Sequence, residues 1–418
     1  MILEALGGIL VGGSLLQLGL VTAVNFRRLA GQNRQSDLSL ELLKTELETM
    51  RDIRRQKAEG GLPWNGWRKF LVARKVKECG DICSFHLAPH DKKNLPGFLP
   101  GQYLTFNLDI PGQPKPVVRC YSLSDGPRPE NYRVTIKRIP PRDKDHPPGL
   151  ASTFFYEQVN EGDILDVKAP SGQFYLDPAG LGGVVLIGSG IGLTPVLAML
   201  NTLITQSSRR EIWFFYGIRN RSEHIMKEHL EAIAREHPNV HLQICASKPD
   251  PDPAYELGRD YQHEGRISGE LFKKVLPSSN FDYYLCGPGP MMQDVTEGLK
   301  EWGVPEKHIH YETFGPSSVK KVAAVVSPEA KVATGYSVQF KKSGKTALWC
   351  GDYTCILDLA EANGVSIPSG CRAGSCGTCQ VAVFSGEVDY IEKSDFETNP
   401  GTRLTCIGAP KSDLVLDA

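Results

Sequence analysis

The chain has 418 residues, and its 47 Lys and Arg side chains nearly balance 48 Asp and Glu, which leaves a formal net charge of −1. A protein whose whole surface binds nucleic acid needs a basic excess, so this balance argues against that class. Hydrophobic residues make up 41% and charged residues 23%, which excludes low-complexity disorder and collagen-like repeats. At about 150 residues per domain, the length predicts two or three domains.

The N-terminal segment carries no charged side chain from Ala5 to Asn25. About 20 helical residues cross the roughly 30 Å hydrocarbon core of a membrane. A signal peptide is disfavoured because the chain lacks a basic start, and a buried core helix because the segment stands apart from any domain pattern. We therefore expect a transmembrane helix over residues 1–26. Arginines follow this span, which predicts a single-pass protein of the inner or cytoplasmic membrane with its catalytic domains in the cytoplasm.

Residues 27–63 are predicted to form a helical stalk. Within them, residues 36–58 have a polar helical pattern with a narrow apolar stripe at Leu40, Leu43, Leu47 and Met50. Such a stripe fits a short coiled coil, or a solvated helix that packs on the next domain. We prefer the second interpretation because the stripe is shorter than about three heptads.

Residues 64–180 show short strands separated by Pro and Gly. Strands are expected over 68–76, 103–108, 132–138 and 163–168, with one short helix over 151–158. Closely spaced strands of this kind are typical of an antiparallel β-barrel.

From residue 181 to residue 316, strands and helices alternate. The pattern predicts strands over 184–188, 212–216, 240–246 and 283–286, and helices over 194–205, 223–236 and 291–302. This alternation predicts an α/β domain with a parallel sheet covered on both faces. Residues 317–334 have no period and are predicted to be a linker, which leaves residues 335–418 as a further domain.

The cysteines are unevenly distributed. The chain has 11 of them, too few for a disulfide scaffold, and three fall within nine residues. Their spacing, C-x4-C-x2-C followed 27 positions later by another Cys, supplies the four thiolates that a [2Fe–2S] cluster needs. A zinc site would more often use two C-x2-C units. The predicted cluster ligands are Cys371, Cys376, Cys379 and Cys406.

The C-terminal domain resembles a plant-type [2Fe–2S] ferredoxin. The stretch 368–379, PSGCRAGSCGTC, matches that family's cluster loop, and residues 404–406 match its closing strand. The resemblance implies an α+β fold of the β-grasp type and a one-electron carrier.

Two further motifs point to a flavin and a nucleotide. In Arg119-Cys120-Tyr121-Ser122, the Arg suits a pyrophosphate, the Tyr a flat ring, and the Ser hydroxyl a ring heteroatom. The glycine-rich segment 188–195 follows a predicted strand and opens a helix, the context in which glycines let the backbone approach a diphosphate. Arg219 lies after the second strand, where an arginine favours a 2′-phosphate and thus NADPH.

Together these motifs resemble the ferredoxin–NADP reductase superfamily over residues 66–316, and in particular the reductase half of flavohaemoglobins and oxygenase reductases with an attached ferredoxin. The resemblance implies that FAD is held by Tyr103, Arg119, Cys120, Tyr121, Ser122, Gly149, Ser152 and Thr153. It assigns the nicotinamide nucleotide to Gly188, Gly190, Ile191, Gly192, Leu193, Thr194, Pro195, Arg219, Gly287 and Pro288, and a flavin-capping segment to Glu312, Phe314 and Gly315. Relatives that use NADH and relatives that use NADPH both carry an Arg-Asn pair near Arg219, so the nucleotide stays open.

The family resemblance also implies the reacting residues, which are Tyr121, Ser122, Cys286, Glu312 and Phe314. The expected protein is multidomain, with an antiparallel β-barrel flavin domain, an α/β nucleotide domain, an α+β ferredoxin domain and an N-terminal transmembrane helix. We expect a membrane-anchored oxidoreductase that passes electrons from NAD(P)H through FAD and the cluster to an oxygenase, desaturase or cytochrome. Alternatives are a quinone or ferric-chelate reductase, or a redox-sensing module.

Overall fold

The computed structural model describes residues 64–312, 314 and 335–418, except for 65, 142, 145, 146, 252–254, 352, 373, 375, 392, 393, 395 and 397. The predicted transmembrane helix, stalk and linker lie outside the described residues, and so does Gly315. Among the residues that are described, no helix has both the length and the apolar character needed to cross a bilayer.

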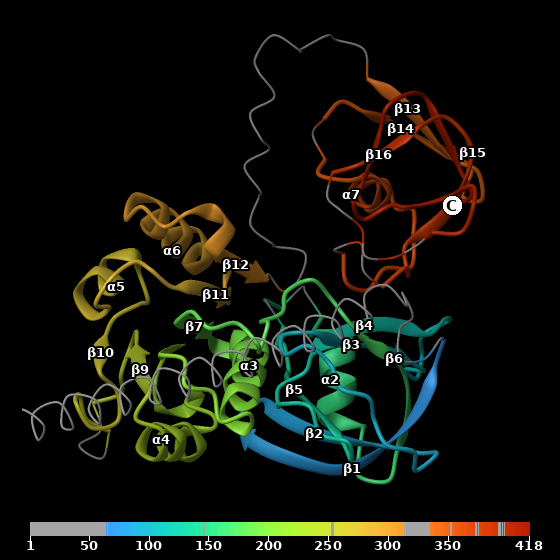
Figure 1. Cartoon of the computed structure of the whole chain (residues 1–418). Helices are drawn as coiled ribbons and strands as arrows, with labels where there is room; N and C mark the ends of the chain where they lie inside the picture. The colour runs from blue at the N-terminus through green and yellow to red at the C-terminus, as the bar shows by residue number, and fades with distance from the viewer. Residues whose placement is uncertain are drawn as a thin grey trace, which may run out of the picture. The chain divides into compact units, whose positions relative to one another are not determined.

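The first domain is a six-stranded antiparallel sheet with the order β4-β3-β6-β1-β2-β5 (Figure 1). Its strands are β1 (Arg68–Cys79), β2 (Ile82–Pro89), β3 (Tyr103–Leu108), β4 (Val117–Ser122), β5 (Tyr132–Lys137) and β6 (Ile164–Ser171). An isolated bridge between Leu123 and Val134 brings the chain after β4 back to β5, as the predicted barrel requires.

Helix α2 (Leu150–Glu157) fills the core of this domain. Its Phe155 is fully buried, and the ring contacts Phe85 and Phe106 edge-on at centroid distances of 5.2 and 5.3 Å. Aromatic pairs favour this edge-to-face arrangement because the ring edge is positive and the ring face negative. The helix therefore holds the two halves of the curled sheet together.

The second domain has a parallel sheet with the order β10-β9-β8-β7-β11-β12. Its strands are β7 (Val184–Ser189), β8 (Ile212–Ile218), β9 (Val240–Ala246), β10 (His263–Glu264), β11 (Asp282–Cys286) and β12 (Ile309–Glu312). Helices α3 (Leu193–Thr205) and α4 (Lys227–Glu236) pack into one hydrophobic core, and α5 (Gly269–Val275) and α6 (Gly289–Glu301) into another. The predicted sheet with two covered faces is confirmed.

One predicted helix of this domain was wrong at its start. The sequence pattern indicated one helix over 223–236, but residues 221–223 form a 3-10 turn and α4 begins only at Lys227. Met226 separates the two in the left-handed region, with a φ of 57°, where a right-handed helix cannot continue. His224 is buried beside the turn, and its Nδ1 lies 2.9 Å from the Tyr255 hydroxyl.

The third domain combines a five-stranded sheet, ordered β14-β13-β19-β15-β17, with a two-stranded sheet of β16 and β18. Its strands are β13 (Tyr336–Phe340), β14 (Lys345–Trp349), β15 (Gln380–Ser385), β16 (Val388–Tyr390), β17 (Thr402–Leu404), β18 (Gly408–Pro410) and β19 (Leu414–Leu416). Helix α7 (Ile356–Ala362) buries its apolar residues in the same core as these strands. The predicted α+β class is confirmed.

Helices α5 and α6 touch through their backbones at Gly269 and Gly298. A methyl group at Gly298 would lie 2.6 Å from the Gly269 Cα. Alanine favours a helix over glycine by about 1 kcal/mol, so helix propensity alone would make Gly298→Ala stabilising. Because the contact leaves no room, we expect the substitution to lower the free energy of unfolding by about 1–3 kcal/mol in chemical denaturation. Glu297→Ala, on an exposed neighbour, is the control, and a gain in stability for Gly298→Ala would contradict the close contact.

Candidate functional site

The strand order of the parallel sheet creates a place for a ligand. Strand β7 is central, and the chain builds β8 on one side of it and β11 on the other. Where the order of a parallel sheet reverses in this way, a crevice opens outside the carboxyl ends of the strands. The glycine-rich segment leaves β7 at this point, and Cys286, Gly287 and Pro288 leave β11 beside it.

The glycines of this segment have specific geometric tasks. A methyl group at Gly192 would overlap the carbonyl oxygen of Cys286, and one at Gly188 would lie 2.9 Å from the Leu193 Cα. Gly190 adopts a φ of 55° with open space around it, a conformation that glycine enters at low cost. The backbone therefore turns tightly into α3, leaving an open surface for a diphosphate at the start of that helix.

Three predicted reacting residues meet at strand ends. Ser122 ends β4, and its hydroxyl donates a hydrogen bond of 3.3 Å to the Glu312 carboxylate, 190 residues away. Cys286 ends β11 and is paired in register with Glu312 at the end of β12. The flavin barrel and the nucleotide domain thus each contribute to one polar cluster.

Burial determines the protonation of this cluster. Removal from water raises the pKa of the Glu312 carboxyl to about 8, although the Ser122 hydroxyl opposes the shift. Burial, and then the nearby Glu312 charge, raises the pKa of the Cys286 thiol well above its usual value. At neutral pH both groups are therefore protonated, and Glu312 can gain or lose a proton near physiological pH.

The predicted flavin residues lie around β3 and β4. Tyr121 packs edge-on against Phe106 and Phe155 at centroid distances of 5.8 and 5.2 Å. Arg119 is exposed on the same face of β4, and Tyr103 is paired in register with Ser122. This arrangement gives a planar ring a stacking partner, and gives a pyrophosphate an arginine.

The start of α2 supplies an observation that fits a bound pyrophosphate. The Thr153 hydroxyl is buried and has no hydrogen-bond partner among the described residues, and a buried polar group without a partner is costly. Ser152, by contrast, donates to the Gly149 carbonyl at 3.0 Å and accepts from the Ile139 amide at 3.2 Å. Of these two predicted ligands, Thr153 has the unused hydrogen-bonding capacity.

The four predicted cluster cysteines lie in two pairs. The Cys371 amide donates to the Cys376 sulfur and the Cys376 amide to the Cys371 sulfur, both at 3.3 Å. Cys379 and Cys406 are linked through Thr405, whose amide and hydroxyl donate to the Cys379 carbonyl at 3.2 and 3.1 Å. No group of three or more His, Cys, Asp or Glu side chains in the described part of the chain could hold a single metal ion. Two cysteine pairs fit two irons with two ligands each.

The remaining predicted residues are placed as follows. Phe314 is 40% exposed beyond the end of β12, and the structure describes Glu312 and Phe314 but not Gly315 of the capping segment. Arg219 follows β8, where its amide donates to the Glu223 carboxylate at 3.1 Å. The Glu223 carboxylate also lies 3.2 Å from the Lys137 ammonium of the barrel. This carboxylate therefore fixes the backbone at the end of β8, where Arg219 was predicted to bind the nucleotide.

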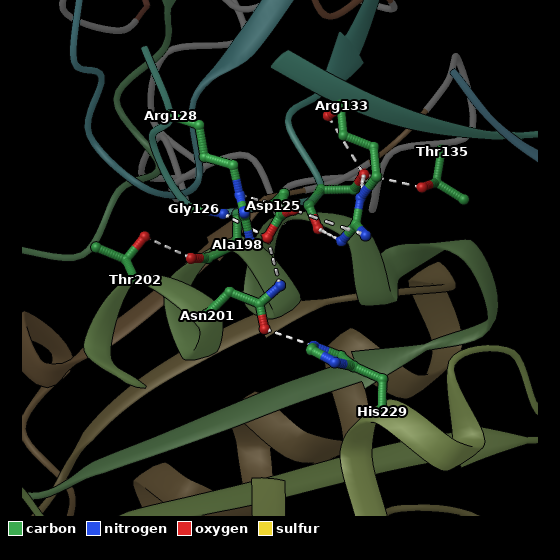
Figure 2. Close-up of polar contacts among 10 residues, drawn as sticks. Asp125, Gly126, Arg128, Arg133, Thr135, Ala198, Asn201, Thr202 and His229 are labelled. Carbon is green, nitrogen blue, oxygen red and sulfur yellow. Dashed lines mark hydrogen bonds and ion pairs between the residues drawn. The ribbon is translucent and has the colours of Figure 1, made fainter. Parts of the chain in front are cut away.

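A second polar network joins the flavin and nucleotide domains, and Figure 2 shows it. The Asn201 side chain of α3 donates a hydrogen bond of 2.7 Å to Asp125, which follows β4. Its oxygen lies 2.8 Å from the Nε2 of His229 on α4. An amide oxygen only accepts, so His229 donates from Nε2. Burial, followed by the charge of Arg133, lowers the pKa of His229, which is therefore neutral at physiological pH.

Comparisons with known proteins agree with this geometry. Three family models match: an oxidoreductase FAD-binding domain over residues 69–175, an oxidoreductase NAD-binding domain over 186–297, and a 2Fe-2S iron-sulfur cluster binding domain over 340–411. The flavohem-like FAD/NAD-binding domain of nitric oxide dioxygenase from Vibrio cholerae is 32% identical, with a TM-score of 0.53, and the match covers 60% of this chain and all of that one. The chain belongs to the ferredoxin–NADP reductase superfamily. It is an NAD(P)H-dependent oxidoreductase that uses FAD and a [2Fe–2S] cluster.

Two further proteins are similar to this chain, and one of the two matches extends into the remaining domain. The flavohemoprotein of Halalkalibacterium halodurans is 39% identical over 260 residues, and the match spans 62% of each chain. Phthalate dioxygenase reductase, described as a modular structure for electron transfer from pyridine nucleotides to [2Fe-2S], is 26% identical with a TM-score of 0.51. That match covers 85% of this chain and 98% of the other, so it extends beyond the flavin and nucleotide domains.

Sequence analysis missed the network around Asn201. Asp125, Asn201 and His229 belong to no motif, and their partners lie up to 76 residues apart along the chain. A polar Asn in the apolar pattern of α3 was the one available signal, because a buried polar side chain needs partners.

We expect Asn201→Ala to weaken the junction between the flavin and nucleotide domains. The substitution removes the partner of the His229 Nε2 and one of the partners of the Asp125 carboxylate, which still accepts from the Gly126 amide and pairs with Arg128. We expect a cost of about 1–3 kcal/mol in the free energy of unfolding. Hydride transfer to the flavin, followed by stopped-flow absorption, should slow because the two domains are held less firmly. Thr205→Ala, an exposed change on the same helix, is the control, and equal rates and stabilities for both variants would show that the network does not align the domains.

We expect Glu312→Gln to change the pH dependence of turnover. A carboxyl accepts a proton only when ionised, so the competent fraction rises as pH passes about 8. Steady-state oxidation of NAD(P)H with an artificial acceptor should rise through that pH in the unaltered protein. The variant should be about 100-fold slower and lose the rise. Glu306→Gln, on an exposed carboxylate, is the control, and the same rise in Glu312→Gln would rule out this role.

Proposed function

We propose that this protein is a membrane-anchored reductase that supplies single electrons to a separate terminal acceptor, such as an oxygenase, desaturase or cytochrome. The observation that supports it most is the junction of Ser122, Cys286 and Glu312 at the strand ends of two domains, in a chain that also carries a paired-cysteine site for a cluster. Phthalate dioxygenase reductase, which is described as transferring electrons from pyridine nucleotides to [2Fe-2S], matches 85% of this chain and is named for an oxygenase.

The protein's residues hold and align the reactants. The glycine-rich turn before α3 binds the diphosphate of NAD(P)H, and Cys286 with Gly287 and Pro288 lines the nicotinamide end of the crevice. Tyr121 would stack on the flavin, Arg119 and Thr153 would bind its pyrophosphate, and Phe314 would cover its exposed side. Such alignment lowers the entropic cost of bringing the two rings together. When bound, the flavin takes a hydride and gives electrons up singly, and the cluster takes one at a time.

Glu312 moves the proton that electron transfer leaves behind. A hydride contains two electrons and one proton, whereas a bound cluster would accept only electrons, so oxidation of each NAD(P)H would leave one proton to be removed. The Ser122 hydroxyl faces Glu312 and passes that proton to the carboxylate. A carboxyl with a pKa of about 8 can accept the proton and release it again near neutral pH.

The membrane part of the proposal rests on the N-terminal sequence. An uncharged run of about one membrane thickness precedes a cluster of arginines, as in single-pass anchors with a cytoplasmic catalytic region. An anchored reductase meets its acceptor in two dimensions, so we propose that the acceptor is itself a membrane protein or acts on a lipid substrate.

The test compares a cluster ligand with a matched cysteine. Cys379 is buried among the cluster cysteines, whereas the Cys350 thiol is exposed in the same domain. We expect Cys379→Ser to lose the paramagnetic signal of the reduced cluster, while NAD(P)H still bleaches the flavin. Cys350→Ser should retain both signals. A full cluster signal in Cys379→Ser, or purified protein without flavin absorption, would contradict the proposal.

Turnover separates the reductase from the alternatives. A reductase bleaches quickly with NAD(P)H and reduces an artificial one-electron acceptor many times over, whereas a sensory module bleaches once without turnover. A quinone or ferric-chelate reductase would sustain turnover with those substrates in Cys379→Ser, since neither substrate requires the cluster. Loss of acceptor reduction together with the cluster supports delivery of electrons through the ferredoxin domain.

A further inference from the structure

A row of side chains crosses three neighbouring strands of the flavin barrel. Cys120 of β4 is paired in register with Thr105 of β3, and Thr105 is paired with Lys168 of β6. Side chains of residues paired across strands lie on the same face of a sheet, about 5 Å apart. Because strand side chains alternate, this row faces away from Arg119 and Tyr121. Cys120, which the motif assigned to the flavin together with them, therefore lies on the opposite face of β4.

The row is covered rather than solvated. Thr105 has no exposed surface, and its hydroxyl lies 3.3 Å from the Cys120 sulfur. A hydroxyl buried on the outer face of a barrel must be packed under another part of the protein. The ferredoxin domain contacts the row through the loop that carries the first cluster cysteines.

Three contacts join that loop to the row. The Lys168 ammonium donates a hydrogen bond of 3.2 Å to the Cys376 carbonyl, 208 residues away. The Cys120 thiol lies within hydrogen-bond reach of the Cys376 sulfur. Gly370 lies against β4, where an added methyl group would be 3.3 Å from a Val118 methyl. These contacts come from different strands and converge on one cluster ligand, Cys376.

The position of Lys168 is itself fixed by its surroundings. Its ammonium lies 4.9 Å from the centroid of the Trp67 ring, a distance at which the ring face attracts a cation. The side chain is therefore held between an aromatic ring and the Cys376 carbonyl. A cation so placed is close to the negative charge that a cluster gains when it is reduced.

We infer that Lys168 and Cys120 are positioning residues for electron transfer, which seat the cluster loop on the flavin-binding strand and raise the reduction potential of the cluster. Each transfer adds one electron to the cluster and breaks no bond, so one hydride requires two transfers. A hydrogen bond to a ligand sulfur and a nearby positive charge both stabilise the added negative charge. The inference rests on the proposed electron path, and adds the residues through which the flavin barrel acts on the cluster.

The test uses full-length Lys168→Gln, which removes the charge, and Lys168→Arg, which keeps it. Redox titration followed by electron paramagnetic resonance should show a lower cluster potential in Lys168→Gln. We expect about a tenfold shift of the redox equilibrium, which equals about 59 mV for a one-electron couple. Stopped-flow absorption should show slower reduction of the cluster and unchanged reduction of the flavin by NAD(P)H. Lys168→Arg should restore most of the potential.

Cys120 provides an independent test with its own pair of variants. Cys120→Ala removes the donor to the Cys376 sulfur and should lower the cluster potential. Cys120→Ser keeps a donor, so its cluster potential should fall less. Lys69→Gln, on a solvated lysine of the adjacent strand β1, controls for the loss of a surface charge and should leave the potential unchanged.

The outcomes separate this inference from the proposed function. Suppose that the unaltered protein shows both cofactor signals. If Lys168→Gln and Cys120→Ala then have the same cluster potential and the same rate of cluster reduction as the unaltered protein, the inference is wrong. If Lys69→Gln shifts the potential as much as Lys168→Gln, the effect comes from general surface charge and the inference is also wrong. Unaltered protein without a flavin or cluster signal would instead refute the proposed function.

Discussion

The hydrogen bond from Ser122 to Glu312 is the interaction on which the rest of the site depends. It joins the last residue of a barrel strand to the last residue of the edge strand in the neighbouring sheet. Both side chains are largely removed from water, and this burial makes Glu312 a carboxyl that exchanges its proton near neutral pH. The same junction brings Cys286 beside the glycine-rich turn, so the proposed hydride delivery and proton removal share one place.

Strand β4 connects the two halves of the electron path. Its period of two places Arg119 and Tyr121 on the flavin face and Cys120 on the face covered by the cluster loop. A short strand therefore carries residues assigned to the flavin on one face and contacts the predicted cluster loop with the other. Strand β6, which lies next to β3 in the same sheet, adds Lys168, whose ammonium donates a hydrogen bond to the loop.

Local patterns predicted the elements well, because they depend on residues close together in the chain. The parallel sheet, the turn before α3 and the cluster cysteines follow from hydrophobic periodicity, glycine geometry and thiolate spacing. The predicted start of α4 was wrong because Met226 adopts a left-handed conformation, which its own helix propensity does not signal. The contacts of Asn201 with Asp125, and of Lys168 with Cys376, could not be predicted, since they depend on how separate domains meet.

The long sequence separation within the Ser122–Glu312 pair has a consequence for biosynthesis. The barrel strands leave the ribosome early, but β12 is the last strand of the second sheet to be translated. Domains fold largely as they emerge, and contacts between distant residues form late. A nascent polypeptide that stalls before β12 can therefore complete the barrel fold while lacking its proton acceptor. Cellular quality control therefore meets a nascent chain that is partly folded but still catalytically inactive.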